Sequence, residues 1–267
     1  MRTVIVIPAR YESSRFPAKP LAMLRGARGA AKPLVQRSYE AACAVPGIAA
    51  VYVATDHPAI ADAATGFGAA VLMTSPDCRN GTERCAQACA ALADPPDVVV
   101  NLQGDAPLTP AYFVTDIVAA LTADDTLAMA TPAIRCDAAH VRALQADEAA
   151  GRVGGTSVVV DAQGRALYFS KRLLPFLPEG AIEDGAATPV RLHIGAYAYR
   201  PAALAAYAAT PPSALERLEG LEQLRFLDAG IAVRVVDVAS PPWQVWELNN
   251  PSDTAPIEAA LAAMGVD

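Results

Sequence analysis

Short apolar runs rich in β-branched residues alternate with alanine-rich stretches through the first hundred residues. The runs predict strands at 4–7, 50–54, 71–74 and 98–102, and the stretches between them predict helices at 34–45, 59–67 and 82–93. Strands that are apolar throughout and separated by helices are typical of a parallel sheet covered on both faces. We therefore expect an α/β fold with a mostly parallel, Rossmann-like sheet.

The pattern changes after about residue 130. Apolar runs there predict strands at 126–134, 157–161, 166–169, 191–199 and 233–238, together with a helix at 215–229 and an exposed loop at 175–189. The turn sequence Asp-Ala-Gln-Gly at 161–164 favours a hairpin between two of these strands. We expect a single α/β domain over residues 1–267, with a smaller mixed subdomain within it at about 130–230.

Composition and charge narrow the class of protein. Of 267 residues, 53% are hydrophobic and 18% are charged, which supports a sizeable core and argues against general disorder. The formal net charge of −7 does not favour a nucleic-acid-binding protein, whose binding face is normally basic. The first apolar run ends at Pro8 after four residues, and no later run reaches membrane length. With five cysteines in no framework spacing, we expect a cytoplasmic protein that binds neither nucleic acid nor membrane.

Positive charge follows the first predicted strand. Residues 8–21 contain Arg10, Arg15 and Lys19, separated mostly by small residues that leave backbone N–H groups free to approach an anion. Ligands of open α/β sheets bind outside the carboxyl ends of the strands, which is where this segment lies. The segment therefore predicts a triphosphate site, and a solvated basic loop is the alternative.

Two further polar segments follow other predicted strands. Arg84 lies near the start of a predicted helix, where its charge does not complement the helix dipole, so either a ligand or the protein surface accounts for it. Asp105 follows Gly104 just beyond the strand at 98–102. It is either a Mg²⁺ ligand suited to phosphate chemistry or a turn-forming residue.

Six patterns occur together along the chain. I-P-A-R-x-x-S-x-R-x-P-x-K-P-L spans 7–21, and S-G-T-E-R corresponds to 80–84. N-x-Q-G-D-E-P corresponds to 101–107 with Ala106 in place of Glu, and A-L-Y-F-S-R to 166–171 with Lys171 in place of Arg. H-I-G-x-Y-A-Y-R is matched at 193–200, and L-E-x-L-E-Q-L-R lies within 217–225. By these motifs the chain resembles the 3-deoxy-manno-octulosonate cytidylyltransferases (CMP-Kdo synthetases) over nearly its whole length, which implies a fold of the nucleotide-diphospho-sugar transferase type.

The resemblance implies an enzyme that transfers CMP from CTP to a 3-deoxy-ulosonic acid and releases pyrophosphate, with Mg²⁺ as cofactor. The residues implied to contact the nucleotide are Pro8, Ala9, Arg10, Ser13, Arg15, Lys19, Arg84 and Gln103. Those implied to contact the acceptor are Gln103, Lys171, His193, Tyr197, Glu222 and Gln223. Arg10, Arg15, Lys19 and Asp105 would be catalytic, mainly through positioning and charge neutralisation. The resemblance also implies a homodimer, with 193–200 and the helix after it near the interface.

The chain departs from this family's pattern on the metal and acceptor side. The family's G-V-D-T-P-E-D, whose first Asp is a second Mg²⁺ ligand, aligns with 247–253, so Asn249 takes the place of that Asp beside Asp105. An Asn oxygen coordinates Mg²⁺ without adding charge, and Glu247 or Asp253 can supply the missing charge. A Lys of the family is missing from 155–159, and the segment 25–32 is longer than the family's usual turn.

These departures leave two alternatives open. One is a cytidylyltransferase for a different acidic acceptor, such as another sugar acid or a phosphonate. The other is a nucleotide-binding homologue that has lost catalysis. Retention of Arg15, Lys19 and Asp105 argues against the second alternative.

Overall fold

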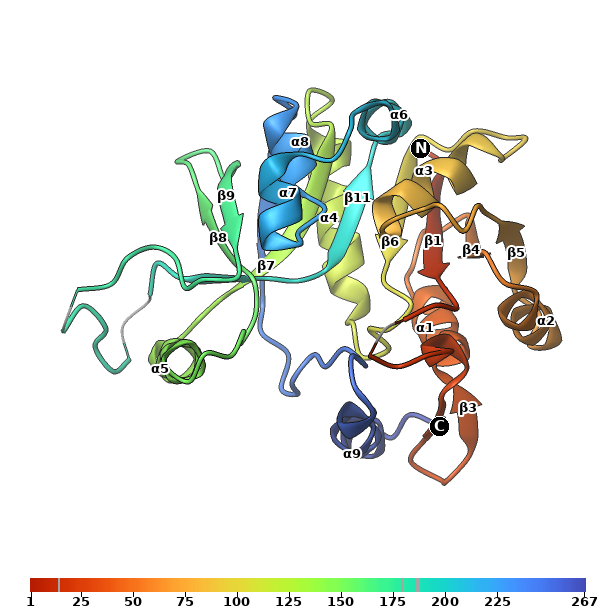
Figure 1. Cartoon of the computed structure of the whole chain (residues 1–267), viewed down its shortest axis with the longest axis horizontal. Coiled ribbons are helices and arrows are strands. Elements are labelled where there is room, and N and C mark those ends of the chain that lie inside the picture. The colour runs from red at the N-terminus through yellow and green to blue at the C-terminus, as the bar shows by residue number, and fades with distance from the viewer. Residues whose placement is uncertain (14, 179, 186–187) are drawn as a thin grey trace.

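A ten-stranded sheet forms the centre of the molecule (Figure 1). The computed structural model describes residues 1–13, 15–178, 180–185 and 188–267. The strands are β1 (Thr3–Ala9), β4 (Ala50–Thr55), β5 (Ala70–Met73), β6 (Val98–Leu102), β7 (Met129–Arg135), β8 (Ser157–Val160), β9 (Ala166–Ser170), β10 (Arg191–His193), β11 (Ala196–Tyr199) and β12 (Val233–Val238). Their order is β5-β4-β1-β6-β11-β7-β10-β8-β9, and β12 also pairs with β7.

Most strands of the sheet run in one direction. β5, β4, β1 and β6 form consecutive parallel pairs, and the pairing directions give β7, β12 and β8 the same orientation. Only β11, β10 and β9 oppose them. The predicted α/β class with a mostly parallel sheet is therefore confirmed.

Helices cover both faces of the parallel half. Ile5 and Ile7 of β1 pack in one core cluster with side chains of α1 (Leu34–Cys43) and α4 (Ala111–Ala123). Val4 and Val6 pack in another with side chains of α3 (Gly81–Ala90) and α6 (Pro201–Ala209). Successive residues of a strand point to opposite faces, so burial of both faces explains the continuous apolar runs in the sequence.

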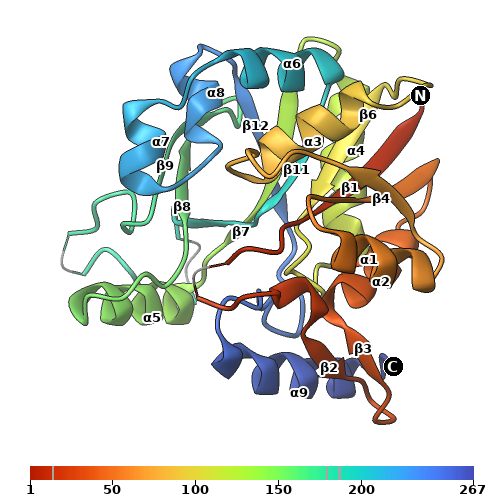
Figure 2. The same cartoon turned by 45° about the vertical axis from the view of Figure 1, so that its right-hand side comes forward.

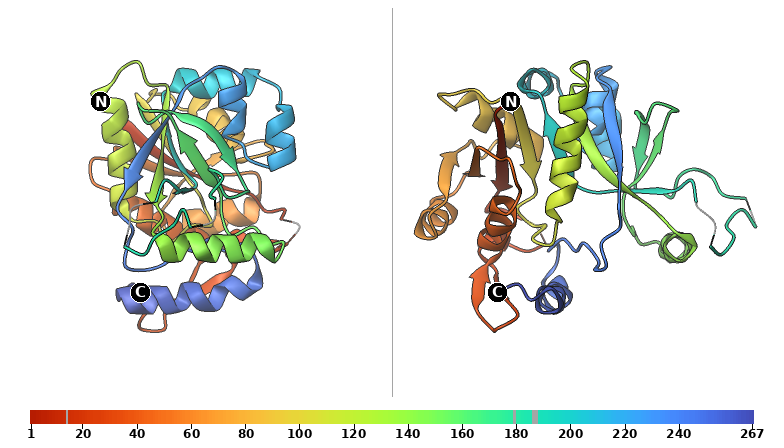
Figure 3. Two further views of the ribbon diagram at one scale, coloured as in Figure 1. Left: turned by 90° about the vertical axis from the view of Figure 1, so that its left-hand side faces the viewer. Right: turned by 180° about the vertical axis from the view of Figure 1, so that it is seen from behind.

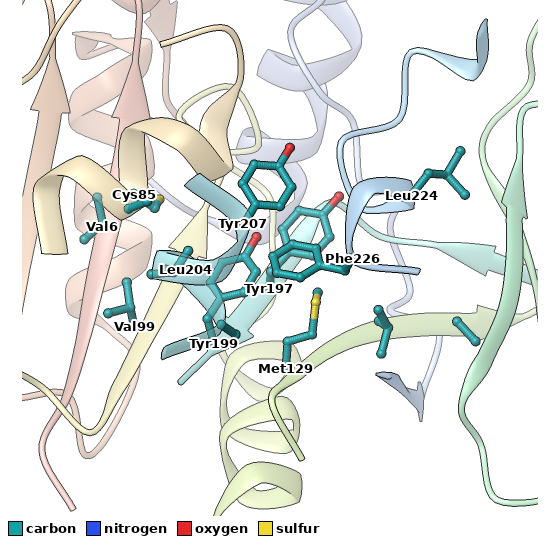
Figure 4. Close-up of a cluster of buried hydrophobic side chains, with 14 of the residues drawn as sticks. Val6, Cys85, Val99, Met129, Tyr197, Tyr199, Leu204, Tyr207, Leu224 and Phe226 are labelled. Carbon is teal, nitrogen blue, oxygen red and sulfur yellow. The ribbon is translucent and has the colours of Figure 1, made fainter. Parts of the chain in front are cut away.

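Aromatic side chains join the two halves of the molecule. Tyr197 and Tyr199 of β11 stack at a ring-centroid distance of 5.8 Å. Phe226, from α8 (Leu224–Asp228), lies 5.6 Å from Tyr199 and 4.7 Å from Tyr207 of α6 (Figure 4). This cluster packs α6 and α8 against the strand that lies between β6 and β7.

The C-terminal segment returns to the N-terminal third of the chain. Helix α9 (Thr254–Met264) packs beside the hairpin of β2 (Met23–Arg25) and β3 (Ala31–Pro33), as Figure 2 shows. Asp267 accepts hydrogen bonds from the backbone N–H groups of Arg28 and Ala30. Before α9, the Leu248 N–H donates to the Asp105 carbonyl at 2.8 Å. Residues 247–249 are thereby held against the turn that follows β6.

Two elements differ from the predictions. The strand predicted at 191–199 is interrupted at Ile194 and Gly195, so that β10 pairs with β7 and β8 whereas β11 pairs with β6 and β7. The helix predicted at 215–229 breaks into α7 (Ala214–Glu219) and α8, because Gly220 adopts φ 63° in the left-handed region. Both predictions of one continuous element were wrong.

The remaining elements complete the outline. Helices α2 (Pro58–Gly66) and α5 (Ala138–Ala149) and the short 3₁₀ segments η1 (Lys19–Leu21) and η2 (Pro251–Asp253) join those already named. The β8–β9 hairpin is confirmed, and it extends the same sheet. Figure 3 shows α5 and α9 at one end of the molecule and α6 at the other.

Residue 14 of the basic segment and residues 179 and 186–187 of the predicted loop lie outside the described residues. Among the helices that are described, none combines the length and hydrophobicity needed to cross a bilayer.

Candidate active site

Lys19 and Asp105 meet at the carboxyl end of the parallel strands. After β1 ends, the chain forms a loop that is closed by a hydrogen bond from the Ala18 N–H to the Tyr11 carbonyl at 3.0 Å. Ala18 itself has φ 55°, which turns the chain so that η1 begins at Lys19. The Lys19 ammonium forms an ion pair with the Asp105 carboxylate, and the two side chains are only 16% and 23% exposed. The first and third segments singled out in the sequence therefore lie in contact.

The backbone of this region leaves no room for extra side-chain atoms. A Cβ added to Gly104 would lie 2.7 Å from the Pro8 carbonyl oxygen, and one added to Gly81 would lie 3.3 Å from Pro8 Cγ. The turn after β6 and the start of α3 thus pack directly on the end of β1, where Pro8 and Ala9 lie. This close approach fixes Asp105 beside the basic loop.

Asn249 connects the C-terminal segment to the basic loop. The Arg15 Nη2 donates to Asn249 Oδ1 at 3.1 Å, and Asn249 Nδ2 donates to Glu247 Oε2 at 3.3 Å. The Asp253 carboxylate accepts from the backbone N–H groups of Asn249 and Asn250, which holds the turn. Arg15, Lys19, Asp105 and Asn249, all predicted site residues, are thereby joined in one cluster.

Glu247 adds a second carboxylate to this cluster. Burial, and after it the negative charge of Asp105, raise its pKa to about 7 against the opposing influence of Asn249, Lys19 and Arg15. The two carboxylates therefore lie close enough to repel each other. From the sequence, Glu247 was expected only as one of two residues, with Asp253, that can supply the charge missing at Asn249.

The oxygen donors of this cluster suit Mg²⁺. In the described part of the chain, no three His, Cys, Asp or Glu side chains gather into a ready-made metal site. Mg²⁺ normally needs fewer, because it binds one or two carboxylates together with substrate phosphates and water. Asp105 and Glu247 provide two carboxylates and Asn249 a neutral oxygen, and a cation would relieve the repulsion between the carboxylates. The residues present fit the ion.

Arg84 connects the loops around the cluster through an ion pair and hydrogen bonds. It is buried, and its Nη2 pairs with Asp56 Oδ2 at 2.8 Å, while Asp56 Oδ1 accepts from the Tyr11 N–H at 3.2 Å. A further hydrogen bond reaches Thr74 just beyond β5. Arg84 thus ties the ends of β4 and β5 to the basic loop, which accounts for a cation at the start of a helix.

Three of the predicted acceptor residues lie around the carboxylate of Glu222. Glu222 accepts from the Thr82 N–H at 2.8 Å and from Gln103 Nε2 at 3.3 Å. Burial raises the pKa of Glu222, and these hydrogen bonds partly offset the effect. Next to it, the Tyr197 hydroxyl donates to Gln223 Oε1 at 3.3 Å. Gln103, Tyr197, Glu222 and Gln223 therefore line adjoining positions between β6, β11 and the start of α8.

The other predicted residues have different hydrogen-bond partners. His193 is buried, and its Nε2 hydrogen-bonds Thr131 Oγ1 at 2.9 Å, while burial lowers its pKa to about 3. Lys171 is exposed, and its backbone N–H donates to Glu219 at 3.0 Å. Arg10 is exposed, and Ser13 Oγ accepts weakly from the Phe16 N–H at 3.4 Å. None of these side chains is joined to the Lys19–Asp105 pair by a hydrogen bond in the described structure.

Comparison with known proteins identifies the family. Residues 4–234 match a family model described as Cytidylyltransferase. The chain is 42% identical to a 3-deoxy-manno-octulosonate cytidylyltransferase of Maricaulis maris over 99% of both chains. It is 38% identical to the enzyme of that name from Syntrophotalea carbinolica, over 99% of this chain and 100% of the other. The chain belongs to the 3-deoxy-manno-octulosonate cytidylyltransferase family.

Solved structures agree with this assignment. A CMP:2-keto-3-deoxy-manno-octonic acid synthetase complexed with CTP superposes with a TM-score of 0.83 at 35% identity, over 99% of this chain and 100% of the other. A 4-diphosphocytidyl-2C-methyl-D-erythritol synthase from Anaerococcus prevotii shares only the fold, with a TM-score of 0.59 at 12% identity. This member of the family is thus a nucleotidyltransferase that uses CTP.

One buried network of the cytidylyltransferase, centred on Arg225, was not predicted from its sequence. Arg225 is 1% exposed, pairs with Glu216 at 2.6 Å and with Glu83 at 3.0 Å, and lies 3.9 Å from the centre of the Tyr207 ring. Asn80, which caps α3, also donates to Glu216 at 3.3 Å. The network joins the start of α3 to α7 and α8, between which the predicted acceptor residues Glu222 and Gln223 lie. Arg225 belongs to a sequence motif, but the sequence did not identify Glu216 and Glu83 as its partners.

Proposed function

We propose that this enzyme transfers CMP from CTP to 3-deoxy-manno-octulosonate with Mg²⁺ as cofactor, releasing pyrophosphate. The observation that carries the proposal is the cluster of Arg15, Lys19, Asp105 and Asn249, which joins three segments at the ligand-binding end of the sheet. The relatives named above, all 3-deoxy-manno-octulosonate cytidylyltransferases, support this acceptor.

The basic loop would bind the triphosphate. Lys19 is held by Asp105 in the free protein, and its ammonium becomes available to phosphate oxygens once they replace that contact. Arg15 and the exposed Arg10, which belong to the same loop, would add positive charge. These groups would neutralise charge that develops on the leaving pyrophosphate while an acceptor oxygen attacks the α-phosphorus in line.

Asp105 and the turn at 247–249 would hold Mg²⁺. When bound, the ion supplies charge neutralisation at the phosphate oxygens during the displacement. The protein's own contribution is to fix the ligands, through the hydrogen bond from the Leu248 N–H to the Asp105 carbonyl and the turn closed by Asp253. This arrangement orients the ligands before the nucleotide arrives.

Gln103, Tyr197, Glu222 and Gln223 would orient the acceptor. Their buried polar atoms suit a ligand with many hydroxyl groups, because buried donors and acceptors require partners. The Gln223 Nε2 is buried without a hydrogen bond among the described residues, so it would be a donor for such a ligand. Lys171 and His193 stay predictions as acceptor contacts.

Pyrophosphate release tests the proposal. With CTP and Mg²⁺, we expect turnover with 3-deoxy-manno-octulosonate and little with other sugar acids or with a phosphonate acceptor. Turnover with a phosphonate alone would contradict the acceptor, and no release with any acceptor would favour a non-catalytic homologue. Calorimetric titration with the four nucleoside triphosphates checks the nucleotide, and equal binding of ATP would contradict the preference for CTP.

A homodimer in the cytoplasm completes the proposal. Residues 193–199 lie inside the sheet and are mostly buried, and the expected place of 193–200 and the helix after it near the interface stays a prediction. Leu218 of α7 is 84% exposed, and Leu167 is 63% exposed on β9, the strand at one edge of the sheet. We expect this apolar edge to bind a second copy. Light scattering at micromolar concentration should give a dimer mass that Leu218→Asp reduces, and a wild-type monomer would contradict it.

A further inference from the structure

We propose that Glu247, and not Asn249, supplies the second protein ligand at the Mg²⁺–phosphate site, and that Asn249 positions the Glu247 carboxylate. The inference rests on the proposed function, because it concerns the same site. It assigns the two residues different tasks, although both lie beside Asp105.

The hydrogen bonds of Asn249 leave its ligand atom engaged. Its Oδ1 accepts from Arg15 at 3.1 Å, and its Nδ2 donates to Glu247 at 3.3 Å. This orientation of the amide follows from its partners, because a guanidinium can only donate and an ionised carboxylate can only accept. The group that Asn249 presents to Glu247 is therefore an N–H, which orients a carboxylate and cannot bind a cation.

The Glu247 carboxylate lies close to Gly195. Its Oε1 lies 3.3 Å from the position of a Cβ on Gly195, and Gln103 Cγ lies 3.7 Å from that same position. Any larger residue at 195 would crowd this carboxylate, so the glycine that interrupts β10 and β11 leaves space for it. Between Glu247 and Asn249, Leu248 is fully buried and its N–H is bound to the Asp105 carbonyl. Glu247 is thus anchored at a fixed place beside Asp105.

The charges around the site indicate a role for the Glu247 carboxylate. Lys19 pairs with Asp105, and Arg15 binds Asn249. Once Lys19 turns to the phosphates, Asp105 and Glu247 would remain as two carboxylates without that cation. Oxygen ligands of this kind are what Mg²⁺ prefers, and two carboxylates with phosphate oxygens complete a usual set.

The experiment measures the contribution of the metal to CTP binding, without acceptor and therefore without turnover. For each variant, calorimetry gives the ratio of CTP affinity with Mn²⁺, a stand-in for Mg²⁺, to CTP affinity in EDTA. The variants are Glu247→Gln, Asn249→Ala and Asp105→Asn. Glu258→Gln is the matched control, because it removes one charge from α9 while retaining an acceptor for the Arg25 N–H. Circular dichroism and binding in EDTA verify the fold.

We expect Glu247→Gln to lower the ratio by about 10-fold or more, Asn249→Ala to lower it less, and Glu258→Gln to leave it unchanged. The double variant Glu247→Gln/Asn249→Asp should recover part of the loss, because it returns a carboxylate two residues along. A larger loss in Asn249→Ala than in Glu247→Gln would overturn the proposal, as would an unchanged ratio in Glu247→Gln together with a loss in Asp105→Asn. In both cases the proposed function survives. A wild-type protein that binds no CTP, or binds it equally with and without metal, removes the proposed function itself.

Discussion

Replacing Arg225 by Met should destabilise the enzyme more than any other single change to a charged residue considered above. Arg225 is 1% exposed and its guanidinium neutralises the side chains of Glu216 and Glu83, each 11% exposed. Met has a similar length, so the substitution removes the charge with little loss of volume. Two carboxylates then remain in a buried position without their partner.

The expected loss of stability follows from the two carboxylates that lose Arg225. Removing one partner of a buried ion pair typically costs about 3–5 kcal/mol, and the lost contact with the Tyr207 ring adds about 0.5–2 kcal/mol. We expect a loss near the lower end of this sum, because Arg79 still pairs with Glu83 at 3.0 Å. For a chain of this size, that loss corresponds to a fall in Tm of roughly 10 °C.

Urea unfolding followed by circular dichroism measures the effect. Arg217→Met on the exposed face of α7 is the control and should stay within about 0.5 kcal/mol of wild type. Adding Glu216→Gln to Arg225→Met should recover part of the loss, because it removes one stranded carboxylate. A loss below about 1 kcal/mol in Arg225→Met would refute the reasoning, since it would mean that water reaches the carboxylates. The KM for the acceptor should rise as well, because Glu222 and Gln223 immediately precede α8.

Three further outcomes are expected. Lys19→Ala should reduce kcat/KM by about 10²–10³, whereas Lys32→Ala, whose ammonium pairs with Glu40 away from the site, should not; near-normal rates in Lys19→Ala would contradict the phosphate role. Gly104→Ala should displace the turn that carries Asp105, because its Cβ would lie 2.7 Å from the Pro8 carbonyl, and steady-state kinetics should show a lower kcat in a folded protein. His193 has a folded pKa of about 3, below its ordinary 6.5, so the unfolded chain takes up the proton first and stability should fall as pH drops from about 6.5 toward 3. His193→Asn should flatten that acid limb in urea titrations, and an unchanged slope would show that His193 is not the group responsible.

Much of the fold could be predicted because burial on two faces leaves a plain signature. The strands at 4–7 and 98–102 are apolar throughout since helices cover both sides of them. Helix α5 left no such signature, because only Ala138 and Val141 of its residues are buried. The breaks at Gly195 and Gly220 were missed for another reason, because each glycine interrupts an otherwise continuous pattern. Only the structure shows that the chain changes strand partner at Gly195 and adopts a left-handed φ at Gly220.

The site was predictable where its residues follow strands. Lys19 and Asp105 come after β1 and β6, which are neighbours in a parallel sheet, so their meeting follows from strand order. The partners of Arg84 and Arg225 were not predictable, because Asp56 and Glu83 are ordinary surface residue types until the fold buries them. Asn249 was placed by a motif alone, and its hydrogen bonds to Arg15 and Glu247 required coordinates.

The pairing of Arg15 with Asn249 has a consequence for the newly made protein. The two residues are 234 positions apart, and the hairpin β2–β3 is bound by α9 across a similar span. Loops of this length close late, because contacts of high sequence separation form only after much of the chain has been ordered. During synthesis the parallel half can fold first, yet its basic loop stays without this partner until residues 247–253 have been translated. A ribosome-bound nascent chain that ends before residue 247 should therefore hold a folded sheet and no working enzyme.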